Sequence, residues 1–105
     1  YTNEEVVEIL QKALECDAVP RSTRVRASAI ALSHPLVESA VAVGCKTFVS
    51  PTTSDRAIMQ GLPALKMGVG DSSRSHTADE FVLASEIEEG IAIYDKLLHE
   101  LSNRL

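Results

Sequence analysis

The chain has 105 residues, of which 45% are apolar, and it contains two Tyr, two Phe and no Trp. This length suits one average domain with a modest core. Ten Lys and Arg residues against 15 Asp and Glu residues give a net charge of -5. We therefore expect no nucleic-acid partner, since the chain lacks both a basic field and a stacking platform.

Neither a membrane span nor a signal peptide is evident, because no apolar run is long enough and the first residues carry no secretory pattern. Cys16 and Cys45 show no CxxC spacing. We interpret them as reduced thiols of a cytoplasmic protein, rather than as a disulfide or a metal site.

The first thirty residues predict a helix followed by a strand. Thr2-Asn3-Glu4-Glu5 has the pattern of a capping box, and apolar residues at helical spacing follow it. We predict a helix from about residue 3 to 15. Residues 19–28 alternate between apolar and polar, which predicts a half-exposed strand. The arginines of this segment favour a solvated strand face over an anion site.

The next segment predicts a helix and a short strand. Ser33-His34-Pro35 is typical of a helix start, apolar residues follow, and Gly44 suits the end of that helix. We interpret His34 as a cap or a packing residue rather than a ligand. Residues 47–50 predict a short strand that Pro51 ends.

Small polar residues precede a second short helix, which is expected at residues 56–60. A helix N-terminus here could bind a carboxylate or phosphate through Thr53 and Ser54. Equally, Ser54 or Asp55 could only cap the helix. This segment alone does not decide between the two. Residues 64–67 predict another strand.

The polar loop 68–81, GVGDSSRSHTADEF, is the main candidate for function. A polar loop of this length in a compact domain is usually functional when it is ordered. Gly68 and Gly70 permit backbone torsions that turn several N–H groups toward one anion. His76 adds the side chain most often used for metal binding or proton transfer near neutral pH.

After a brief strand expected at residues 81–83, a second capping box at Ser85-Glu86-Ile87-Glu88 predicts the C-terminal helix. One stripe of this helix is expected to be core: Ile87, Ile91, Tyr94, Leu98 and Leu101. The alternation of helices and strands along the whole chain favours an α/β layered domain with partly parallel strands.

From the residues alone, the chemistry is incomplete. His76 with Asp79 and Glu80 is a weak metal signal, because a catalytic zinc needs three protein ligands in a fixed arrangement. No nucleophile-elbow motif is present, and no Ser–His–Asp triad can be assembled.

Two segments carry a resemblance to a known family. MGVGDSSRSHTADEF at 67–81, with the helix EIEEGIAIYDKLL at 86–98, resembles the C-terminal end of the zinc-dependent amidohydrolases and peptidases. SPTTSDRAIM at 50–59 resembles the small-residue substrate loop of that family. Within the family, the chain resembles the branch of acetylornithine or succinylornithine deacetylases, which serve arginine biosynthesis.

The resemblance implies roles for five residues. His76 matches the last metal ligand of a site with two zinc or cobalt ions per subunit. Thr53 and Ser54, with the backbone near Gly70 and Ser72, would bind the carboxylate end of an N-acyl amino acid. No catalytic residue is assigned within the chain.

The resemblance also implies an architecture. Residues 1–28 would be the last helix and strand of an α+β lid and dimerisation domain, which implies a homodimer. Residues 29–105 would be the C-terminal part of the catalytic domain. Two positions depart from the family pattern: Val69 replaces a common Pro, and Val49 a frequent Gly.

The family's His-x-Asp ligand motif, bridging Asp and Glu-Glu pair have no counterpart in the chain. We therefore expect a C-terminal segment of an enzyme in which a metal-activated water attacks the acyl carbon. The alternative is a non-enzymatic α/β module that binds a small carboxylate or phosphate through loops 50–55 and 68–76. An upstream His-x-Asp and Glu-Glu would decide for the hydrolase.

Overall fold

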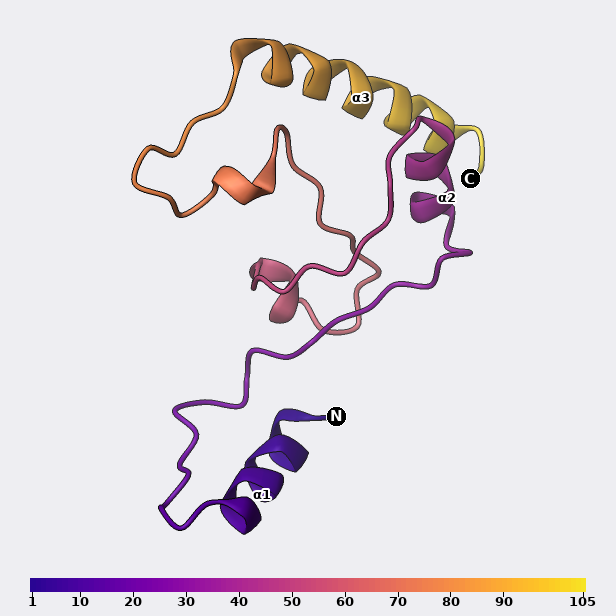
Figure 1. Cartoon of the computed structure of the whole chain (residues 1–105). Coiled ribbons are helices and arrows are strands. Elements are labelled where there is room, and N and C mark those ends of the chain that lie inside the picture. Colours follow the sequence, from indigo (N-terminus) through magenta and orange to yellow (C-terminus); the bar gives the residue numbers. More distant parts are fainter. The chain divides into compact units, whose positions relative to one another are not determined.

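The computed structural model describes residues 1–105 and is built from three α-helices joined by long irregular segments (Figure 1). The helices are α1 (Asn3–Ala13), α2 (Pro35–Ala42) and α3 (Ala84–Ser102). Two short 3-10 turns, η1 (Asp55–Ala57) and η2 (Ser72–Arg74), lie between α2 and α3 in the chain. No helix is long and apolar enough to cross a membrane.

The predicted α/β fold with a partly parallel sheet is wrong, because the structure contains no strand. Residues 19–28, 47–50, 64–67 and 81–83 are all predicted as strands, and none forms a ladder. A strand exists only when a neighbouring strand takes up its N–H and C=O groups. Alternation of apolar and polar residues tells which side chains would share one face of a strand, but not which strand would pair with it. It therefore predicted strands for segments that have no pairing strand within these 105 residues.

The sequence pattern predicted α1 well. Thr2 Oγ1 accepts a hydrogen bond from the Glu5 amide at 3.1 Å, and the Glu5 carboxylate accepts one from the Thr2 amide at 2.7 Å. This reciprocal capping box satisfies two amides that a helix N-terminus leaves without partners. The predicted start at residue 3 is confirmed, and the helix ends at Ala13, two residues before the predicted end at about residue 15.

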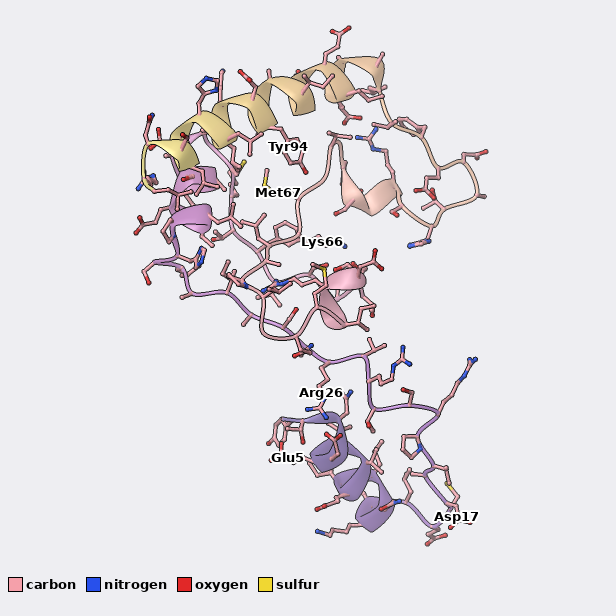
Figure 2. The ribbon with its side chains drawn as sticks, turned by 180° about the vertical axis from the view of Figure 1, so that it is seen from behind. Glu5, Asp17, Arg26, Lys66, Met67 and Tyr94 are labelled. Atoms are coloured by element: carbon pink, nitrogen blue, oxygen red, sulfur yellow. The ribbon has the colours of Figure 1, made fainter.

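By internal contacts the chain divides into two compact units, which are described separately. The first comprises residues 1–29 and 50–64. In it, the Asn3 side-chain amide donates to the carbonyls of Thr23 at 3.0 Å and Val25 at 2.8 Å. Figure 2 shows Arg26 at the N-terminal end of α1, where it pairs with Glu4 at 3.0 Å. These contacts hold α1 by its first turn, and no residue of α1 is buried.

The second unit comprises residues 30–49 and 65–105, and its core is the packing of α2 on α3. Val37 and Ala40 of α2 and Leu97 of α3 are buried there. Arg104 joins the two helices by pairing with Glu38 at 3.1 Å and Glu100 at 2.9 Å. This small apolar contact, closed by one arginine, holds α2 against the C-terminal half of α3 (Figure 1).

The bounds of α2 also follow from its sequence. His34 Nδ1 accepts a hydrogen bond from the Leu36 amide at 3.2 Å, which makes His34 the N-cap. Gly44 lies just beyond the helix with φ 95°, a left-handed torsion that suits glycine. Of the two interpretations of His34, a cap or a packing residue, the structure shows the cap, and the prediction that Gly44 ends the helix is confirmed.

The apolar stripe predicted as core on α3 is wrong. Ile87, Ile91 and Leu98 are 45%, 66% and 61% exposed, whereas Gly90 and Leu97 are buried. The buried positions lie one residue before Ile91 and Leu98, so the helix is turned by roughly 100° from the predicted orientation. Tyr94, on the border between the two faces, points from α3 toward Met67 (Figure 2).

Candidate functional site

The polar loop predicted to carry function folds into a turn that its own side chains stabilise. Asp71 Oδ1 accepts a hydrogen bond from the Ser73 amide at 2.8 Å and so begins η2. This bond from Ser73 lowers the pKa of the Asp71 carboxyl below its ordinary value. Such an Asx-type turn replaces the hydrogen bonds that regular structure would supply.

Arg74 connects this turn to the start of α3. Its guanidinium forms an ion pair and a hydrogen bond with the Glu86 carboxylate, and both side chains are only about one-fifth exposed. The same guanidinium lies 4.7 Å from the centre of the Phe81 ring, within cation–π range. The bond to Glu86 raises the pKa of Arg74, and the bond from Arg74 lowers the pKa of Glu86.

Glu86 has a second role as part of the N-cap of α3. Its Oε2 accepts a hydrogen bond from the Leu83 amide at 2.8 Å, while Oε1 receives Arg74. The helix therefore begins at Ala84, and its N-cap is Leu83, two residues before the Ser85 that the predicted capping box would make the N-cap. One carboxylate thus both caps α3 and holds the loop.

His76 follows η2 and has the one positive φ, 61°, among the non-glycine residues of the structure. Its amide donates to Glu80 Oε2 at 3.0 Å, and the Thr77 hydroxyl donates to the Arg74 carbonyl at 2.7 Å. These two bonds support the left-handed turn, which histidine adopts more readily than most side chains. The His76 residue itself is exposed to solvent.

The two loop glycines differ in what their backbone requires. Gly70 has φ 73°, and a Cβ at this position would lie 3.0 Å from Glu86 Oε2. A Cβ at Gly68 would meet nothing within 4 Å. The conformational argument for a glycine therefore applies to Gly70 and not to Gly68.

Thr53 and Ser54 precede η1 in the first compact unit, whereas Gly70, Ser72 and His76 share one loop in the second. The structure therefore brings the last three together and places the first two on a separate segment. Ser54 is the N-cap residue of η1, yet its side chain makes no capping hydrogen bond. The predicted helix at 56–60 is reduced to the three residues of η1.

The fit of a metal ion can be judged from the side chains present. The structure contains no group of three or more His, Cys, Asp or Glu residues that could hold one. A catalytic zinc takes three protein ligands, and His76 would supply at most one of them. Residues 1–105 therefore do not form a metal site by themselves, and no chemical step is assigned to a metal here.

Sequence reasoning missed the two contacts that fix the loop on α3. One is the Arg74–Glu86 pair, and the other is the seat of Val69 on Gly90, where a Cβ would overlap the valine side chain. A glycine in the middle of a strongly periodic helix is the signal that could have pointed to the second, because it indicates close approach of another group.

The family model described as peptidase family M20/M25/M40 matches residues 3–100, nearly the whole chain. The chain belongs to this family. No protein in the curated collection matches the chain significantly. Membership of the M20 family supports a peptidase or amidohydrolase type of function, and it distinguishes neither the deacetylase branch nor a particular substrate.

Proposed function

We propose that this M20-family chain forms part of a metal-dependent amidohydrolase that releases the acyl group from an N-acyl amino acid. The finer proposal is a deacetylase acting on acetylornithine or succinylornithine in arginine biosynthesis. Family membership supports hydrolase activity in the complete protein, in a family whose members are generally metal-dependent. The acyl group, the amino acid and the cytoplasmic location belong to the proposal alone.

The observation that carries the proposal is the ordered loop within the matched region. His76 stands exposed at the end of a turn that Asp71, Arg74 and Glu80 hold by hydrogen bonds. An exposed imidazole on a fixed backbone is suited to join a metal whose other ligands lie elsewhere in the protein. The backbone near Gly70 and Ser72 is proposed to receive the carboxylate of the substrate.

The first experiment compares the 105-residue chain with the full reading frame that encodes it. We expect no hydrolysis of N-acetylornithine by the chain alone with added zinc or cobalt, because it lacks a general base and two further ligands. The full protein should hydrolyse it. Turnover by the pure chain above a metal-only blank would contradict the division of the site between the chain and other residues.

The second experiment tests His76. In the full protein, His76→Ala should remove up to one metal ion per subunit and reduce kcat strongly, because a direct metal ligand is lost. His99→Ala is the matched control, since His99 is also exposed and contacts Asp95 on its own helix. Near-normal activity and two bound ions in His76→Ala would refute the assignment. A full protein without hydrolase activity would favour a binding module instead.

A further inference from the structure

We propose that Arg74 is a positioning residue: with Val69 it attaches the loop to one face of α3 and so sets where His76 is presented. The functional meaning of this role rests on the function proposed above. The role itself concerns only the conformation of the loop. Nothing in the family match assigns a role to Arg74, Glu86, Val69 or Gly90.

The first attachment is electrostatic and specific in geometry. Arg74 lies two residues before His76, and its guanidinium pairs with the Glu86 carboxylate and lies within cation–π range of the Phe81 ring. An arginine whose charge is paired and which also contacts an aromatic ring loses freedom that a solvated arginine keeps. Because the Arg74 carbonyl also accepts the Thr77 hydroxyl, the backbone on both sides of His76 is tied to Arg74.

The second attachment is steric. Val69 lies against the backbone of Gly90, which is buried, and no side chain larger than hydrogen fits there without movement. Glycine is a poor choice inside a helix unless a close approach requires it. Glu86 and Gly90 are four residues apart, so both attachments are made to the same face of α3.

The two attachments hold the loop at its beginning and at its middle. Val69 holds the beginning of the loop on Gly90, and Arg74 holds its middle on Glu86. The position of the turn at residues 72–77 is therefore fixed relative to α3. The cap from Glu86 to the Leu83 amide fixes the end of the loop at that same carboxylate. A ligand that must meet groups elsewhere in a protein benefits from such preorganisation.

The test is amide hydrogen exchange on the ¹⁵N-labelled 105-residue chain, without metal or substrate. Arg74→Ala should accelerate exchange of the Ser75 and His76 amides by roughly five- to tenfold, as expected when a charge-assisted contact that orders a loop is lost. Amides in the last three turns of α3 should change by less than about twofold, because their hydrogen bonds lie within the helix. Arg74→Lys should protect the Ser75 and His76 amides better than Arg74→Ala does, because lysine keeps the positive charge but lacks the planar set of donors of the guanidinium.

The variant Gly90→Ala tests the contact of Val69 with Gly90, and Gly68→Ala is its matched control. Alanine is the better helix former, so exchange within α3 should slow while exchange at Ser75 and His76 accelerates. Gly68→Ala should change neither, because a Cβ there meets open space. Opposite changes in the loop and the helix are what a positioning role predicts.

Three results would overturn the proposal. They are unchanged loop amides in Arg74→Ala, equal acceleration of the loop and α3, and a Gly90→Ala chain that behaves like Gly68→Ala. Equal acceleration would mean that the Arg74–Glu86 pair only stabilises the helix. Since the test involves no metal and no substrate, a loop that responds as expected in a protein without hydrolase activity refutes the proposed function and not the positioning role.

Discussion

The N-termini of α1 and α3 are built alike but are used differently. In each, a glutamate at the third helical position accepts the amide of the N-cap residue: Glu5 for Thr2 and Glu86 for Leu83. Each first turn also makes an ion pair with a distant arginine. The Glu4–Arg26 pair is about half exposed, whereas the Arg74–Glu86 pair is about one-fifth exposed.

The two helices differ in whether one of their faces is packed against the rest of the chain. α3 has a buried face that contains Gly90 and Leu97, and α2 packs against it. α1 has no buried residue, and contacts at its first turn hold it to residues 23–26. A cap thus fixes where a helix begins, while a packed face decides whether that helix can support something else. In this chain, only α3 supports the candidate loop.

Cutting back one leucine in each helix should give the largest contrast. Leu97→Ala removes a side chain that is 3% exposed from the contact of α2 with α3. We expect a loss of about 2–3 kcal/mol in the free energy of unfolding. Leu10→Ala in α1, where Leu10 is 43% exposed, should cost less than about 1 kcal/mol. Urea unfolding followed by circular dichroism measures both, and equal losses would contradict the contrast.

The second prediction asks whether the exposed face of α1 is covered by a second copy of the chain. Val6 and Leu10 of α1 are each 43% exposed, and Leu14, the C-cap residue of this helix, is 47% exposed. Exposed apolar residues that gather on one face indicate an interaction surface. The homodimer predicted from the sequence would place this face at a two-fold contact. Sedimentation over a concentration series should show association.

The double variant Val6→Glu, Leu10→Glu should weaken that association by about tenfold or more, because two charges would be buried in the contact. The matched control is Ile91→Glu, Leu98→Glu, which adds the same charge to exposed apolar positions on α3. Dissociation by the control alone would place the contact on α3. A wild-type chain that stays monomeric at high micromolar concentration would exclude the dimer.

The sequence predicted what is local. The Thr2–Glu5 capping box, the His34 cap and the end of α2 at Gly44 depend on residues within four positions of each other. Their physics is complete within a short segment, so pattern reading finds them.

The sequence could not predict what is distant. The expected strands failed because period-two alternation gives no information about a partner. The prediction that Ile87 and Ile91 are core was wrong because α3 is apolar over a wide arc. In such a helix, packing and not the sequence pattern decides which part of the arc is buried. Arg74 and Glu86 stand 12 residues apart, and neither residue alone indicates the other.

A third prediction separates the real helix start from the expected one on α3. Thr2→Ala removes the side-chain acceptor of the α1 cap and should cost about 1 kcal/mol. Ser85→Ala should change the free energy of unfolding by no more than about 0.5 kcal/mol, because Ser85 lies inside the helix and Leu83 is the N-cap. Thermal unfolding by circular dichroism measures both. A larger loss in Ser85→Ala would show that the helix starts where the sequence suggested.

The smallest expected effect is the acid response of the two ion pairs, since both are at least partly solvated. Hydrogen bonds from Arg74 and from the Leu83 amide lower the pKa of Glu86. The pKa of Glu4 is lowered by a hydrogen bond from the Glu4 backbone amide and by the charge of Arg26. A carboxyl with a lowered pKa stabilises the fold fully above its unfolded pKa of about 4.3, and this stabilisation is lost as the pH falls through the folded pKa.

NMR titration of the side-chain carboxyl carbons should therefore give midpoints below the ordinary glutamate pKa for both residues. The comparison becomes sharper in about 1 M salt, where the screening length is about 3 Å. The Glu4 midpoint should move up by the part of its lowering that Arg26 supplies, because that pair is half exposed, while the larger part from its backbone amide stays. The Glu86 midpoint should move less, since its pair with Arg74 is better shielded and its second oxygen caps α3. If salt moves Glu86 as far as Glu4, the Arg74 pair is an ordinary surface contact, and the two helix starts do not differ in the way proposed.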